Sequence, residues 1–343
     1  MINYRSINND NSILIHKFIN EKNVKEYILP SFINDKKVTD IGVASFADEK
    51  QLRRVSFSPY ISEVGRAAFK NSNVVEYIYN SNLREIRDEA FANNYMMKNN
   101  NLQDTNVITM GSRVYKSCVL LKRAVLPFLL QDIGTGTFMD CESLEYADVS
   151  SLFIIPSKTF YMCVSLEVAK INDMLQKIGN ECFRKNIHLK SFPILYFLYS
   201  IGAYAFAESG LIEFKGTESL HYIGKGCFSD NINIEIIDLL ITKIKKLEPM
   251  LVHGCTSLKQ MILPSDLVEI SDYVFGGCVS LKEIFIPPSV EKISSKAFFT
   301  KIYDDKEKLI SEKPIDITII CERGSAAEIF AKNNNIKYVY EGE

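Results

Sequence analysis

The sequence repeats itself every 22 to 24 residues, and this feature constrains the fold more than any other. The repeated unit reads IGxxAF followed by LxxIxI, and residues 273–293, YVFGGCVSLKEIFIPPSVEKI, contain most of one copy. A unit this short, with one brief strand, cannot bury its own apolar side chains. Stacked units can bury them, so the chain is predicted to form a solenoid.

Each copy is marked by one anchor residue, which is aromatic in every copy but one. The anchors are Phe46, Phe69, Phe91, Tyr115, Phe138, Phe160, Phe183, Phe206, Phe228, Val252, Phe275 and Phe298. An aliphatic residue follows six positions later, as at Leu52, Leu121, Leu144, Leu166, Leu189, Leu258 and Leu281. We expect both sets to stack as buried columns.

The LxxIxI spacing predicts a short strand that turns alternate side chains inward. Prolines such as Pro127, Pro264 and Pro287 often follow it, and proline suits a strand end because it cannot donate to a ladder. The expected inward positions include Val55, Phe57, Ala124, Leu126, Phe192, Ile194, Ile237, Leu239, Met261, Leu263, Ile284 and Ile286.

The unit IGxxAFxxCxSLxxIxIPxSVxx resembles the BspA-like leucine-rich repeat over residues 24–298, and departs from it around residues 92–110, where polar residues intervene. Together with the period, the resemblance implies a leucine-rich repeat solenoid. We expect a right-handed stack of about twelve units with one parallel β-sheet, capped at both ends. The predicted domains are an N-terminal cap with the first strand (1–45), the repeats (46–300) and a C-terminal cap (301–343).

Both caps have sequence signals. Asn34 and Asp35 are typical of a hairpin turn. Residues 301–314 are expected to form a charged loop and residues 315–320 a strand. Ser325 and Glu328 form a capping-box signature that opens a helix through about Asn333, and residues 336–340 form a last strand. The resemblance implies a similar strand, helix and strand, and so a complete C-terminus.

Charge and hydropathy exclude some partners. Lys and Arg number 40 against 42 Asp and Glu, a net charge of −2, so nucleic acid is not an expected partner. The first 18 residues lack the apolar core of a secretory signal peptide. Residues 191–207 are uncharged, but the run is short for a membrane span and keeps the register of the repeat.

The cysteines follow the repeat. Five of them come three residues after an anchor, at Cys118, Cys141, Cys163, Cys255 and Cys278, while Cys182 and Cys227 precede one. A position that recurs in register is a packing position, so we expect inert buried thiols, with disulfides as the alternative. Cys321 lies outside this pattern and is expected to be the most accessible.

No catalytic, metal or cofactor site is expected. A metal site or a triad needs side chains that converge on one point, and the histidines fall in different repeats, at His16, His188, His221 and His253. Gly134 and Gly136 of GTGTF occupy the IGxxAF slot, which favours a backbone turn over a phosphate loop.

The outward strand positions are the candidates for binding. Ile236, Ile262 and Phe285 lie on three of the last four predicted strands, and contiguous exposed apolar groups mark interaction sites. The alternatives are a covering loop or a one-residue slip of the strand. The partner-binding candidates are Arg123, Tyr146, Lys170, Ile236, Ile262, Glu283 and Phe285.

The resemblance implies a non-enzymatic binding protein that presents an extended surface to a protein or glycan partner, in cell-surface adhesion or host contact. Two alternatives stay open: an intracellular protein-protein scaffold in the cytoplasm, and a structural protein that assembles with its own copies.

Overall fold

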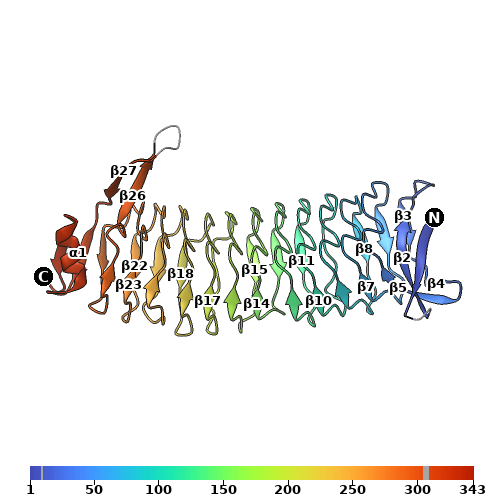
Figure 1. Cartoon of the computed structure of the whole chain (residues 1–343), viewed down its shortest axis with the longest axis horizontal. Coiled ribbons are helices and arrows are strands. Elements are labelled where there is room, and N and C mark those ends of the chain that lie inside the picture. Colours follow the sequence, from blue (N-terminus) through green and yellow to red (C-terminus); the bar gives the residue numbers. More distant parts are fainter. Residues whose placement is uncertain (9–10, 304–308) are drawn as a thin grey trace. The chain divides into compact units, whose positions relative to one another are not determined.

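Each turn of the repeat carries two short strands in most places, where the sequence predicts one. The computed structural model describes residues 1–8, 11–303 and 309–343. It contains two units, Met1–Asn172 and Asp173–Glu343, which are blue to green and yellow to red in Figure 1. Parallel strands of successive turns pair in register within each unit, as expected for a leucine-rich repeat solenoid.

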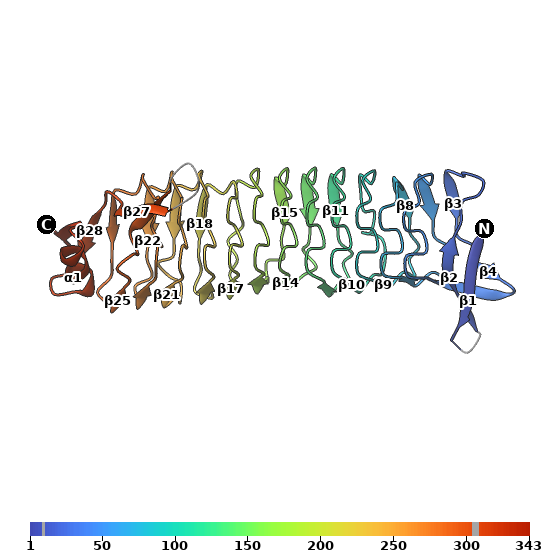
Figure 2. The same cartoon turned by 45° about the horizontal axis from the view of Figure 1, so that its top comes forward.

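The first unit begins with a hairpin and continues as two ladders (Figure 2). Strands β1 (Ile2–Ile7) and β2 (Ser12–Phe18) are antiparallel, and β2 then pairs in parallel with β5 (Lys36–Ile41). The first ladder contains β3 (Glu26–Ile28), β6 (Arg54–Ser56) and β8 (Glu76–Ile78), and, as a separate sheet, β11 (Arg123–Val125), β13 (Tyr146–Asp148) and β15 (Val168–Lys170). The second contains β5, β7 (Glu63–Val64), β9 (Glu85–Ile86), β10 (Thr109–Met110) and β12 (Asp132–Ile133), and β14 (Ile154–Ile155) follows in the same phase.

The second unit has the same two kinds of strand. Its first ladder contains β18 (Glu213–Lys215), β20 (Ile236–Asp238) and β22 (Gln260–Ile262), and a separate sheet of β24 (Glu283–Phe285), β28 (Thr318–Cys321) and β29 (Lys337–Tyr340). Its second contains β16 (Lys177–Ile178), β17 (Ser200–Ile201) and β19 (Tyr222–Ile223), and then β21 (Lys246–Leu247), β23 (Glu269–Ile270) and β25 (Lys292–Ile293).

The second ladder adds to the predicted architecture. Each of its strands ends five residues before an anchor, at the isoleucine position of IGxxAF, which was expected to form a turn. The glycine that follows lets the backbones of two turns approach: a Cβ at Gly134 would lie 2.3 Å from the backbone nitrogen of Ser112. Gly136 has a φ of 64°. GTGTF is therefore a backbone turn, as predicted.

The anchors form the core. All of them are fully buried, and their rings stack at centroid distances such as 5.5 Å for Phe91 and Tyr115 and 5.2 Å for Phe183 and Phe206. The backbone N–H of an anchor also donates to the next turn, as from Phe206 to the carbonyl of Cys227 at 2.9 Å. Stacked rings and backbone hydrogen bonds together fix the register of the turns.

The predicted cap signals are present. Asn34 and Asp35 have φ angles of 48° and 59° and join β4 (Phe32–Ile33) to β5, as a two-residue hairpin requires. The charged segment 301–314 is not simply a loop: β26 (Phe299–Tyr303) and β27 (Leu309–Pro314) pair as an antiparallel hairpin that stands out from the stacked turns in Figure 1. Residues 304–308 lie outside the described part.

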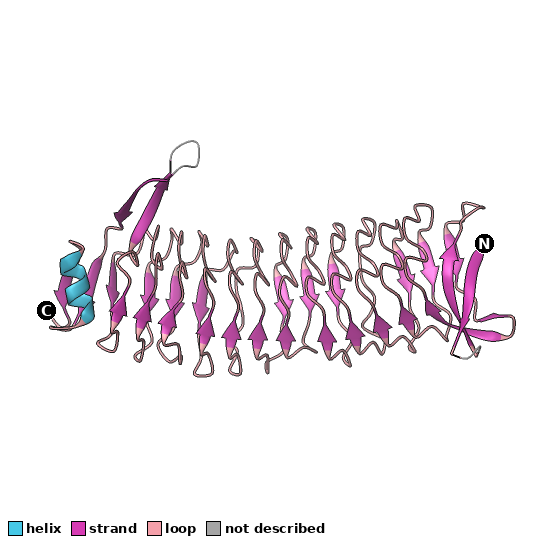
Figure 3. Ribbon diagram, in the orientation of Figure 1, coloured by secondary structure: helices cyan, strands magenta, loops and turns pink. Residues whose placement is uncertain are grey.

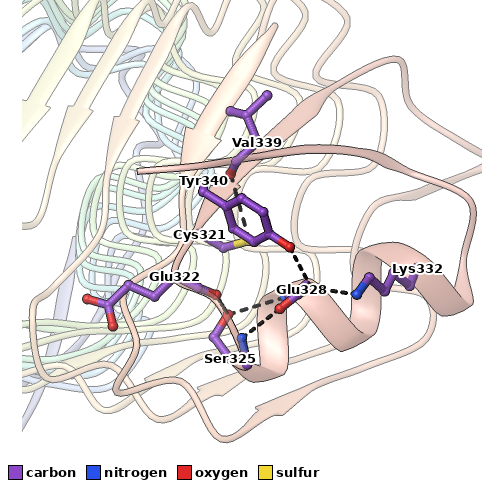
Figure 4. A network of polar contacts seen from close by, with 8 residues as sticks. Cys321, Glu322, Ser325, Glu328, Lys332, Val339 and Tyr340 are labelled. Atoms are coloured by element: carbon purple, nitrogen blue, oxygen red, sulfur yellow. Dashed lines mark hydrogen bonds and ion pairs between the residues drawn. The ribbon is translucent and has the colours of Figure 1, made fainter. Parts of the chain in front are cut away.

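Helix α1 (Ala326–Asn333), cyan in Figure 3, follows the predicted capping signal. The Glu328 N–H donates to the Ser325 hydroxyl at 3.3 Å, and Glu328 accepts from the Gly324 N–H at 2.6 Å (Figure 4). The pKa of the Glu328 carboxyl is lowered to about 2, because the carboxylate accepts hydrogen bonds from the Lys332 ammonium, the Gly324 N–H and the Tyr340 hydroxyl. This network ties the helix to β29.

Candidate functional site

Side chains along the strands of the first ladder point alternately inward and outward, as the LxxIxI spacing predicts. Inward side chains such as Val55, Leu239 and Ile284 are buried. One inward assignment is wrong: Ile194 is exposed, and Leu195 is buried in its place. Pro193 precedes this point and cannot donate to a ladder, and no named strand forms at residues 191–193.

The outward row of the second unit borders an apolar groove. The groove has a volume of about 720 Å³ and lies at β22, β24 and β28. Its lining includes the predicted Ile262, Glu283 and Phe285. The Phe285 side chain is 37% exposed there. The remaining apolar side chains of the lining are Leu240, Met261, Leu263, Ile284, Pro287, Pro288 and Ile320.

The groove coincides with a break in the first ladder. β20 pairs with β22, and β24 pairs with β28, but β22 and β24 belong to different sheets. At the intact step, the N–H of Lys259 donates to Glu235 and that of Leu239 to Ile262. The corresponding amides at the break, of Lys282 and Leu263, have no backbone acceptor among the described residues.

The two charged side chains at the groove rim, Lys259 and Glu283, differ in their ion pairing. The Lys259 ammonium lies 2.8 Å from a carboxylate oxygen of Glu235 and is thereby neutralised. Glu283 is exposed and has no cation within ion-pairing distance in the part of the chain that the structure describes. The groove therefore presents an apolar floor beside one uncompensated carboxylate.

The other predicted binding residues lie elsewhere. Ile236 is 39% exposed on β20 and pairs in register with Gln260 of the groove lining. Arg123, Tyr146 and Lys170 lie in the first unit, on β11, β13 and β15. Arg123 stacks on Tyr146, while Lys170 pairs with Asp148 at 3.0 Å. The structure brings together Ile262, Glu283 and Phe285, but not the whole predicted set.

Part of the groove was not predicted from the sequence. Leu240 and Pro288 belong to connections after strands, where period-two alternation makes no prediction. Ile320 belongs to β28, which continues the ladder from β24 after the inserted hairpin. The alternating apolar pattern of residues 315–320 was the available signal, and extending the outward row across the insertion would have found Ile320.

All eight cysteines are free and buried, as the repeat predicts for the seven that follow its pattern. Those three residues after an anchor donate to the anchor carbonyl of the preceding turn, as from Cys255 to Phe228 at 3.0 Å. Burial raises the pKa of the Cys278 thiol to about 12. The expectation for Cys321 is wrong: it is buried, because β28 and β29 pair in register there, and its thiol faces the Val339 carbonyl of β29 (Figure 4).

We expect a thiol reagent at pH 8 to leave the native chain unmodified, because only an accessible thiolate reacts readily. In denaturant all eight cysteines become reactive. Intact-mass spectrometry before and after denaturation measures the difference. Rapid modification of even one native cysteine would contradict the buried ladder.

Within the described ranges, no group of three or more His, Cys, Asp or Glu side chains is placed to hold a metal ion. The histidines lie at separate turns, as their spacing indicates. In the same ranges, no helix is long and apolar enough to cross a membrane.

The stacked parallel strands and the buried anchor column define a leucine-rich repeat protein. A family model described as the BspA type leucine rich repeat region (6 copies) matches residues 12–145, 153–248 and 176–303. The chain belongs to this family, and the family suggests a protein-interaction role.

Solved structures share the fold. A leucine-rich repeat protein from Bacteroides ovatus aligns with a TM-score of 0.68 at 19% identity, over 99% of this chain and 98% of that chain. A leucine-rich repeat protein from Eubacterium ventriosum gives 0.52 at 16% identity, over 84% and 90%. The T. pallidum leucine-rich repeat protein gives 0.50 at 23% identity, over 55% and 88%. No curated protein sequence matches this chain.

Proposed function

We propose that this chain is a non-enzymatic binding protein and that the groove at β22, β24 and β28 holds a segment of a partner protein. The observation that carries the proposal is the apolar hollow of about 720 Å³ at a break in the ladder. Ligand sites of this size are typically concave, apolar and bordered by a few polar groups. The binding would serve cell-surface adhesion or host contact, as the family resemblance implies.

The groove chemistry defines the partner segment. An apolar side chain fits against Ile262 and Phe285. A neighbouring lysine or arginine would compensate Glu283. The partner is therefore a peptide segment that carries an apolar residue close to a basic one.

Peptide display against the full chain, followed by fluorescence polarisation with the selected peptides, tests this function. We expect apolar and basic residues to be enriched, and Phe285→Ser to weaken binding by about tenfold. Ile78→Ser is the matched control, because Ile78 is 43% exposed on the same kind of strand in the first unit. Equal binding by Phe285→Ser and the parent chain would exclude the groove.

The intracellular scaffold is the second candidate, and the eight free cysteines favour it, because free thiols persist in reducing compartments. The same groove would then bind a cytosolic partner. Fractionation of the cells that make the protein separates the two: recovery in the surface fraction contradicts the scaffold, and recovery in the cytosol contradicts adhesion.

A further inference from the structure

The irregular turn around residues 92–110 borders a polar hollow in the first unit. The hollow has a volume of about 380 Å³. This is near the lower end of the range typical of small-ligand sites, roughly 300–1,000 Å³. Its lining consists of Asn99, Asn100, Asn101, Gln103, Arg123 and Val125. Five of these six side chains are polar, which sets the hollow apart from the apolar groove of the second unit.

Asn100 builds the wall of this hollow. Its side-chain amide donates to the Val125 carbonyl at 3.2 Å and accepts from the Val125 N–H at 3.1 Å, so it replaces the backbone of a strand. The strand pairing between this turn and β11 is reduced, among the described residues, to an isolated bridge between Asn99 and Arg123. Asn100 is 2% exposed, whereas Asn99 and Asn101 are exposed on either side of it.

Arg123 is held in place and carries a free charge. Its guanidinium carbon lies 4.0 Å from the ring centroid of Tyr146, its register partner on β13. Arg54, Lys122 and Lys170 of the same ladder each pair with a carboxylate. Arg123 has no carboxylate within ion-pairing distance in residues 1–8, 11–303 and 309–343. A planar guanidinium fixed on an aromatic ring is well suited to bind a carboxylate through two hydrogen bonds.

The amides beside Arg123 supply the rest of the site. Asn99 and Asn101 make no side-chain hydrogen bond within the described chain. The Gln103 amide nitrogen donates to Asp104 at 3.2 Å, and the Gln103 side-chain oxygen is left to accept. Each amide combines donor and acceptor atoms, as hydroxyl groups do. Several amides in one hollow therefore match a ligand that carries several hydroxyls.

We propose that this hollow binds an acidic sugar, that is, a hexuronate or sialate residue of a glycan. Its carboxylate binds the Arg123 guanidinium, and its hydroxyls bind the amides of Asn99, Asn101 and Gln103. An acidic peptide fits less well, because Val125 is the one apolar side chain in the lining. This site lies in the first unit and does not depend on the peptide groove of the second.

Binding of simple sugars to the full chain tests the site. The probes are glucuronic acid and N-acetylneuraminic acid, with glucose and acetate as matched compounds, measured by saturation-transfer NMR and calorimetry. We expect saturable millimolar binding of at least one acidic sugar. Glucose lacks the carboxylate and acetate lacks the hydroxyls, so each should bind at least about tenfold more weakly.

Two variants separate the site from general charge effects. Arg123→Gln should weaken binding of the acidic sugar by about tenfold or more, with unchanged thermal unfolding, because the side chain is exposed. Arg54→Gln is the control, since the Arg54 guanidinium is already paired with Glu76 at 2.7 Å. Absence of binding to both acidic sugars would overturn the proposal, as would an unaffected Arg123→Gln variant. Acetate binding as tight as that of the sugars would overturn the sugar assignment.

Discussion

Phe206→Ala is expected to lower the free energy of unfolding by about 3 to 5 kcal/mol. Phe206 is fully buried in the anchor column, where its ring lies 5.2 Å from that of Phe183 and 5.9 Å from that of Phe228. Phe192 also contacts it edge-on at 4.9 Å. Removing the ring leaves a cavity that these neighbours cannot fill without giving up their own stacking. Urea unfolding followed by circular dichroism measures the loss.

Phe285→Ala is the matched control, because Phe285 is 37% exposed at the groove rim. Its expected cost is below about 1 kcal/mol, as for most surface substitutions. Equal losses for Phe206→Ala and Phe285→Ala would contradict the division into inward anchor and outward binding residue. A lesser cost for Phe206→Ala would mean that the column can collapse around the missing ring.

The anchor column and the first ladder could be predicted because their signals are local and repeated. Each anchor recurs with its apolar partners at a fixed spacing, so errors in one copy are corrected by the others. The exception, Ile194, falls where Pro193 interrupts the strand and the neighbouring Leu195 becomes the buried residue. A single copy would not have distinguished these two positions.

The loop geometry on either side of the anchors was not predicted, and only one side of it has a sequence signal. The residues two before and two after an anchor have left-handed φ angles, such as 54° at Tyr204 and 56° at Glu208. Left-handed backbone normally favours glycine. Here the stacked turns impose it through hydrogen bonds such as the one from the Tyr204 N–H to the Lys225 carbonyl at 2.9 Å. The position two before an anchor holds side chains of many kinds and carries no signal. The position two after it is mostly Asn, Asp or Gly, which favour a left-handed φ, at Asp48, Asn71, Asn93, Asp140, Asp230, Gly254 and Gly277.

The candidate sites also exceed what the pattern predicts, because both arise where the strand pairing between successive turns is interrupted. The peptide groove lies where β22 and β24 do not pair, although both copies have a regular sequence. The polar hollow forms where Asn100 replaces the backbone of a strand with its side chain. In regular turns the backbone N–H and C=O groups form hydrogen bonds with the neighbouring turns. Groups that can bind a partner therefore become available where this pairing is interrupted.

Asn231→Ala is expected to lower the free energy of unfolding by about 2 to 3 kcal/mol, the cost of leaving buried polar groups unpaired. Asn231 is fully buried three residues after the anchor Phe228. Its amide nitrogen donates to the Phe206 carbonyl at 2.7 Å, and its oxygen accepts from the Ser209 hydroxyl at 2.7 Å. The amide nitrogen also donates to the Phe228 carbonyl at 3.0 Å. Alanine removes all three bonds and also leaves a small cavity. Urea unfolding again measures the loss.

Asn231→Cys separates the effect of the lost hydrogen bonds from the effect of the cavity. Cysteine occupies the same position in other turns, where the Cys255 thiol donates to Phe228 and the Cys278 thiol to Val252. A cysteine at 231 should therefore bond to the Phe206 carbonyl and recover about 1 kcal/mol relative to alanine, the contribution of one hydrogen bond. If cysteine and alanine are equally destabilising, satisfaction of the anchor carbonyl is not what selects Cys and Asn at this position, and packing volume alone must account for them.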